Sequence, residues 1–195
     1  MSSQVRLLLL SGTGGAGTST VSLRLAEQSA ALGLRTHLVD MSDARDRAAA
    51  REAATPWLGS LLAEAMLGQL ADPLLPEELS ALPGIDEFLA LAAIADAADD
   101  ESLDVLIVDA GPLEALERLL MLPATLELLA ESLMTPEQAM VAGTGMLVEL
   151  RAELSRIRGV LERESTTVRL VVEPSSDRHV EQLARIGLRA SVLTP

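Results

Sequence analysis

Five short apolar runs are spaced along the chain, at residues 5–10, 35–40, 103–109, 168–173 and 188–193. Turn-forming or charged residues bound each run, and the apolar residues within a run are largely continuous rather than alternating with polar ones. This pattern is typical of strands that are buried on both faces. It therefore predicts five strands of a largely parallel sheet.

Helical periodicity occupies the segments between these runs. The predicted helices lie at residues 19–32, 57–70, 85–98 and 177–186, and a longer helical region lies at about 113–164. Strands that alternate with helices indicate an α/β fold with a doubly wound, mostly parallel sheet and helices on both faces. We expect one domain that spans residues 1–195, with the helical region as an insertion.

A narrow apolar seam runs through the end of this helical region. Its members recur at steps of three and four and are Leu147, Leu150, Leu154, Ile157 and Leu161. Such a seam is typical of a helix that packs on the body of its own domain, and also of a helix that binds a partner helix. We favour the first interpretation, with residues 147–161 as a candidate partner-binding helix in the second.

Charge and composition exclude several classes of partner. The chain has 15 basic and 29 acidic residues, a formal net charge of −14, which disfavours a nucleic-acid surface or contact with an anionic membrane. It contains no cysteine, which fits a reducing compartment. Its apolar runs are too short for a signal-peptide core or a membrane span. We expect a cytoplasmic protein that neither binds nucleic acid nor inserts into a membrane.

The stretch LSGTGGAGTSTV (residues 10–21) follows the first predicted strand and matches two glycine motifs. As G-x-G-x-x-G, with Asp40 at the end of the second strand, it fits a dinucleotide-binding loop. As a Walker A loop, G-x-x-x-x-G-K-[ST], it has Gly12, Gly17 and Ser19 in place and Thr18 at the lysine position. Asp109 ends the third predicted strand, where an acid would help to hold Mg²⁺ in a Walker-type site.

The loop resembles the deviant Walker A sequence, G-K-G-G-V-G-K-[ST]-T, of the ArsA-type ATPases, a family that includes the arsenite-pump ATPase and tail-anchored-protein targeting factors. The matching loop residues are Gly12, Gly14, Gly15, Gly17, Ser19 and Thr20. Three further segments resemble the same family: LPGIDEFLALAAI (82–94), LDVLIVDAGPLEALERLLMLP (103–123) and VRLVVEPSSDRHVEQLARIGL (168–188). The resemblance runs nearly end to end and implies a P-loop NTPase fold.

The same resemblance implies a site for ATP with Mg²⁺. The nucleotide-contacting residues would be Gly12, Thr13, Gly14, Gly15, Ala16, Gly17, Thr18, Ser19, Thr20 and Asp109. Ser19 and Asp109 would hold the metal. Family members work as dimers, which implies a homodimer or a heteromer with an ArsA-type paralogue.

The chain departs from the family at its charged positions. Thr13 stands where the family has its signature lysine, and Thr18 replaces the loop lysine. Ser42 occupies the position of an acid in the segment that follows the second strand, and the chain has no asparagine for adenine. We therefore expect weak or absent binding of Mg·ATP, with weakened or lost hydrolysis, in a regulatory or structural subunit. The alternatives are a slow Mg·ATP-dependent ATPase and a dinucleotide-binding oxidoreductase.

Overall fold

The computed structural model of the protein describes residues 4–13, 17–43, 45, 49, 85–132, 144–171 and 190–193. The described strands are β1 (Arg6–Gly12), β2 (Thr36–Asp40), β3 (Val105–Pro112), β4 (Thr166–Val171) and β5 (Ala190–Leu193). The described helices are α1 (Thr18–Ala31), α4 (Ile85–Ala98), α5 (Leu113–Ser132) and α7 (Thr144–Glu162). The helices predicted at residues 57–70 and 177–186 lie outside the described residues.

The five strands form one sheet in the order β2-β3-β1-β4-β5, and every pair of neighbours is parallel. The central strand β1 places Leu9 opposite Val108 of β3 and opposite Val168 of β4. All five strands predicted from the apolar runs are present, with shifted ends. The predicted α/β fold with a parallel sheet is confirmed.

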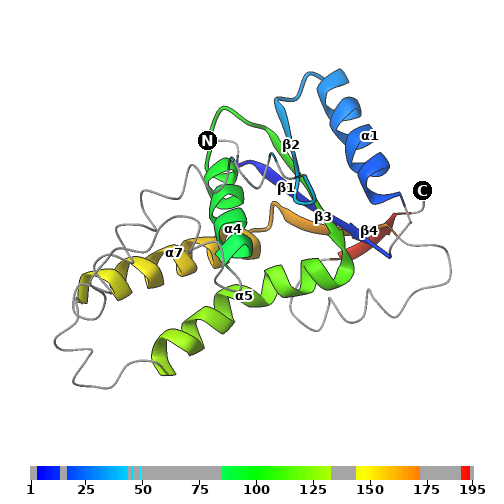
Figure 1. The fold of residues 1–195 in the computed structure, drawn as a ribbon. Helices are drawn as coiled ribbons and strands as arrows, with labels where there is room; N and C mark the ends of the chain where they lie inside the picture. The colour runs from blue at the N-terminus through cyan, green and yellow to red at the C-terminus, as the bar shows by residue number, and fades with distance from the viewer. Residues whose placement is uncertain are drawn as a thin grey trace.

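Helices cover both faces of the sheet. Helix α1 lies on one face, and α4, α5 and α7 lie on the other (Figure 1). Along β1, Leu7 and Leu9 pack under α4, α5 and α7, whereas Leu8 and Leu10 pack under α1. Successive side chains of a strand point to opposite faces, and both faces here are covered. This arrangement explains why the strands are continuous apolar runs.

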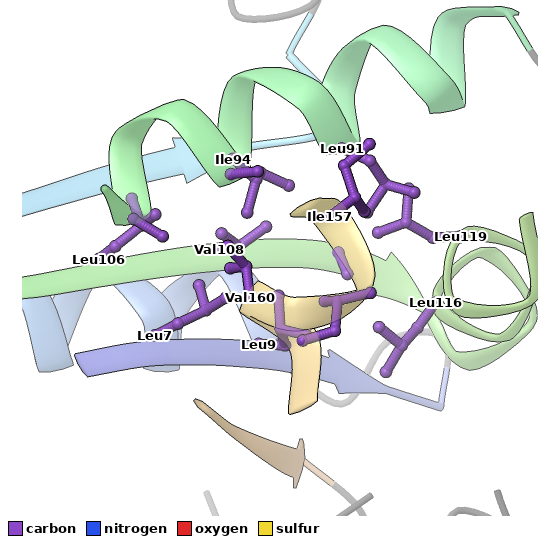
Figure 2. Packing of buried hydrophobic residues seen from close by; sticks show 14 of the residues in the cluster. Leu7, Leu9, Leu91, Ile94, Leu106, Val108, Leu116, Leu119, Ile157 and Val160 are labelled. Atoms are coloured by element: carbon purple, nitrogen blue, oxygen red, sulfur yellow. The ribbon is translucent and has the colours of Figure 1, made fainter. Parts of the chain in front are cut away.

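The larger core lies under α4, α5 and α7. Figure 2 shows side chains of β1 and β3, such as Leu7 and Val108, in one cluster with Ile94 of α4, Leu116 of α5 and Val160 of α7. These residues are almost completely buried. The three helices are therefore fixed to the sheet, and they determine what surrounds the carboxyl end of β3.

The apolar seam of α7 is part of this core. Leu154 and Ile157 are at most 1% exposed, Leu161 is also buried, and Leu150 is partly buried against the same cluster. The side chain of Leu147 lies outside the described residues. The interpretation of the seam as core packing is confirmed. The burial of these three residues favours core packing over the alternative, a partner-binding face at residues 147–161, which stays a prediction.

Ion pairs reinforce the contact between α7 and α4. Arg156 of α7 lies 2.8 Å from a carboxylate oxygen of Asp96 and 3.2 Å from one of Asp99, both on or next to α4. Hydrogen bonding to Glu153 raises the pKa of Arg156 despite its partial burial.

In the part of the chain that the structure describes, no helix is long and apolar enough to cross a bilayer.

Candidate functional site

The glycine-rich loop joins the end of β1 to the start of α1. Gly12 ends β1, and a Cβ atom built on it would lie 2.5 Å from Thr18 Oγ1 and 2.5 Å from the carbonyl oxygen of Val171. Gly17 precedes α1 with φ +78°, a left-handed conformation that favours glycine. Both positions therefore require glycine for physical reasons. Gly14, Gly15 and Ala16 lie outside the described residues.

The first turn of α1 presents donors to the loop. The first turn of a helix carries N–H groups without intrahelical acceptors and a partial positive charge, which together favour an anion. Among the residues that the structure describes, no side chain caps these groups, and the first turn contains no acidic residue. Ser19 and Thr20 are exposed, and Thr13 and Thr18 are partly exposed. This end of α1 is accessible and suited to phosphate oxygens.

Asp109 lies on the α1 side of the sheet. It pairs with Leu10 in the β1–β3 ladder, and directly paired side chains point to the same face, which for Leu10 is the face under α1. Asp109 is only 2% exposed. Its Oδ1 accepts a hydrogen bond of 2.9 Å from the Gly111 N–H, whereas Oδ2 is buried and has no hydrogen-bond partner among the described residues.

A buried carboxylate oxygen without a partner is costly, and native proteins usually satisfy such atoms with a donor, water or a cation. Asp109 Oδ2 is therefore suited to a metal ion or its bound water at the carboxyl end of β3. No group of three or more acidic or histidine side chains gathers as a metal site within the described residues. A metal at Asp109 would depend on oxygen atoms from a hydroxyl such as that of Ser19, from phosphate and from water.

The Gly111 peptide connects β1 to the end of β3. Its N–H donates to Asp109 Oδ1, and its carbonyl oxygen accepts a hydrogen bond of 2.9 Å from Ser11 Oγ. Gly111 has φ +71°, and Ser11 is fully buried next to the glycine loop. Ser11 and Gly111 belong to this candidate site but are not among the residues predicted for it from the sequence. The available signal was the glycine–proline pair at residues 111–112, two residues after Asp109.

A bulge in the β1–β3 ladder accompanies this connection. Leu10 pairs with Asp109, but Gly12 pairs with Pro112, so β3 has one more residue than β1 between these two pairs. Bulges often occur next to functional sites, where they redirect side chains. Here the extra residue brings the Gly111 peptide between Asp109 and Ser11.

Asp40, the acid that a dinucleotide-binding loop would use for ribose, belongs to a local turn. Its Oδ1 accepts hydrogen bonds of 2.8 Å from the N–H and 2.6 Å from the hydroxyl of Ser42. Asp40 pairs with Asp109 across the β2–β3 ladder, so the two acids lie on neighbouring strands where β2 ends. The turn engages one of the two carboxylate oxygens of Asp40.

The residues present fit only part of a Mg·nucleotide site. The glycines, the start of α1, the Ser19 hydroxyl and Asp109 Oδ2 suit phosphate and metal. The loop supplies no compensating positive side chain of its own, because the chain contains no basic residue between Arg6 and Arg24. Within the loop, a bound phosphate would be balanced by backbone N–H groups and a metal ion.

The parallel sheet, the glycine loop before α1 and the acid at the end of β3 together define a P-loop NTPase-type protein. The chain matches the anion-transporting ATPase (ArsA) family over residues 48–190, more than half of its length. It therefore belongs to the anion-transporting ATPase family. The matched range contains Asp109 and begins after the glycine loop. Comparison with individual curated proteins found no match.

Proposed function

We propose that this chain is a degenerate member of its family with weakened or lost ATP hydrolysis. It acts as a regulatory or structural subunit of a homodimer or of a heteromer with an intact paralogue. The observation that carries the proposal is that only part of the family's nucleotide site is present. The loop glycines, the open start of α1 and Asp109 are kept, but threonine stands at both positions where the resembled loop has lysine.

The retained groups have defined roles in binding. The N–H groups at the start of α1 bind phosphate oxygens, and the Ser19 hydroxyl and Asp109 Oδ2 hold the metal. Mg·ATP, when bound, supplies the phosphoanhydride bond that an active family member hydrolyses. The Gly111 N–H keeps Oδ1 of Asp109 occupied, which leaves Oδ2 as the oxygen that faces the metal.

The two missing lysines determine how much phosphate binding and hydrolysis are weakened. A charge-assisted hydrogen bond contributes about 1.5–3 kcal/mol, so replacing the loop lysine by Thr18 weakens phosphate binding about 10- to 100-fold. The lysine that Thr13 replaces acts across a dimer, in a role similar to an arginine finger. Such groups contribute about 10³–10⁵ in rate. Hydrolysis is therefore affected more than binding.

We expect the purified protein to release phosphate from ATP no faster than its Asp109→Asn variant. Restoring charge with Thr13→Lys and Thr18→Lys together is expected to tighten Mg·ATP binding about 10- to 100-fold. The double variant Thr13→Gln and Thr18→Gln has side chains of comparable length without charge and is the matched control. Phosphate release and calorimetric titration measure the two effects.

Two outcomes contradict this proposal. A turnover of about 1 s⁻¹ or faster that Asp109→Asn abolishes would identify the protein as a working ATPase. A rise in melting temperature with NADH, and none with Mg·ATP or Mg·ADP, would support the oxidoreductase alternative. The family membership favours the ATPase-type loop over that alternative.

The proposed dimer forms across the loop face, defined as residues 12–20 and 109–113, and forms without nucleotide. Two copies of this face carry no opposed lysines, and glycine permits close approach of backbones. A net charge of −14 favours either an apolar interface or a more basic partner. Light scattering is expected to show a dimer of the chain alone, or a heteromer with an ArsA-type paralogue. Thr13→Glu is expected to weaken this association, whereas Gln28→Glu, at an exposed position of α1, is expected to leave it unchanged.

A strict monomer under every condition would rule out this assembly. A dimer that appears only after ATP is added would show that the loop face still works as a nucleotide-dependent interface.

A further inference from the structure

A pocket of about 300 Å³ lies beside the carboxyl end of β3. Its walls come from the turn after β2, the first turns of α4, the Gly111–Pro112 segment and α5. Apolar side chains, including Leu119 and Ala90, form part of its surface. Small-molecule sites are typically about 300–1,000 Å³ and combine apolar walls with a few fixed polar groups. This pocket is at the lower end of that range.

Two opposite charges line the pocket without pairing with each other. Glu87 projects from α4 and Arg118 from α5. Within the described ranges, neither side chain has an ion pair or a hydrogen bond. Arg156 and Arg163, by contrast, both pair with carboxylates that lie on or just after α4. Glu87 and Arg118 are the charged groups of this region that the fold does not use.

The charges of Glu87 and Arg118 together favour a ligand that carries both an anionic and a cationic group. A simple anion would meet Arg118 but also the nearby carboxylates of Glu87 and Asp86. A simple cation would leave the Arg118 guanidinium unmatched. A molecule with one anionic and one cationic group satisfies both, because guanidinium–carboxylate and ammonium–carboxylate hydrogen bonds are the strong, charge-assisted kind.

We propose that this pocket binds a small aliphatic zwitterion of the amino-acid class. Its carboxylate lies on Arg118, its ammonium group lies on Glu87, and its side chain lies against Leu119 and Ala90. Ser42 also lines the pocket. The site lies on the face of the sheet opposite α1, and the proposal does not depend on nucleotide binding.

The test uses leucine and its two half-molecules, without nucleotide. Calorimetric titration of the full chain is expected to show saturable binding of L-leucine. Binding of 4-methylpentanoate, which lacks the ammonium group, and of isoamylamine, which lacks the carboxylate, is expected to be at least about 10-fold weaker. Glycine, alanine and valine define the preferred side-chain size. Methyl-labelled methionine locates the ligand, because Met41 lines the pocket and Met121 does not.

Arg118→Gln and Glu87→Gln are each expected to weaken leucine binding at least about 10-fold. The matched controls are Arg24→Gln on exposed α1 and Glu114→Gln at the exposed start of α5, which should bind leucine as the wild type does. Circular dichroism checks that every variant is folded, and Arg118→Lys provides a second variant that keeps the charge. The lysine variant is expected to retain part of the binding.

Three results would overturn the proposal. They are no binding of any of the four amino acids at about 10 mM, equal binding of leucine and one half-molecule, and a response of Met121 rather than Met41. Equal binding of 4-methylpentanoate would identify a site for anions. Failure of this test leaves the proposed loss of ATP hydrolysis unaffected, because that proposal concerns the loop on the α1 side.

Discussion

Leu154→Glu is expected to lower the free energy of unfolding by about 3–5 kcal/mol. Leu154 is fully buried in α7, where it belongs to the core cluster beneath α4, α5 and α7. The substitution removes apolar packing and places a carboxylate where the cluster offers it no cationic partner. Total stability of a domain is only about 5–15 kcal/mol, so a large part of it is lost. Urea unfolding followed by circular dichroism measures the change.

Val148→Glu is the matched control on the same helix, because Val148 is 64% exposed. Its expected effect is within about 0.5 kcal/mol, as for other surface substitutions. If Leu154→Glu leaves the unfolding midpoint unchanged while abolishing association with another protein, the seam would be a partner-binding face after all.

Gly12→Ala is expected to destabilise the protein by about 1–3 kcal/mol, the usual range for overpacking. The added Cβ atom would lie 2.5 Å from the Val171 carbonyl oxygen, a backbone atom between two paired strands, and 2.5 Å from Thr18 Oγ1. Thr18 could rotate, but the carbonyl could move only if β4 shifted against β1. Thermal unfolding is expected to show a loss of several degrees, since 1 kcal/mol corresponds to about 2–4 °C in a chain of this size.

Gly159→Ala provides the opposite control. A Cβ atom on Gly159 meets nothing within 4 Å, and Gly159 lies inside α7. Alanine in a helix interior is favoured over glycine by up to about 1 kcal/mol, so this variant is expected to be more stable than the wild type. A Gly12→Ala variant as stable as the wild type would show that β4 yields to the methyl group, and the loop would then tolerate side chains at its first glycine.

Most of the fold could be predicted from the sequence because both faces of the sheet are covered. Full burial makes each strand a continuous apolar run, as in residues 103–109, and the runs are easily separated from the amphipathic helices between them. Strand ends were less accurate: β3 continues to Pro112, three residues beyond the predicted end. A bulge lies in the β1–β3 ladder there, and a bulge produces no periodic pattern of apolar residues in the sequence.

The candidate site was predictable only where a motif fixes a residue type. Gly12 and Gly17 could be identified because a close approach and a positive φ, respectively, require glycine. Asp109 could be identified because it is an acid directly after an apolar run. The Ser11–Gly111 hydrogen bond joins residues that lie 100 positions apart, and the pairing of strands that brings them together is not encoded locally. The pocket of Glu87 and Arg118 depends on how α4 and α5 are rotated, which the sequence alone did not determine.

The single extra residue in β3 also sets the rotation of α5. Helix α5 begins at Leu113, directly after the ladder pair of Pro112 and Gly12. Each residue advances a helix by about 100° around its axis. With one residue fewer between Asp109 and Leu113, every side chain of α5 would turn by that angle. Leu116 and Leu119 would then leave the core, and Arg118 would no longer line the pocket. The three residues between Asp109 and Leu113 thus fix the rotation of α5 about its axis, so that Leu116 and Leu119 face the core while Arg118 lines the pocket.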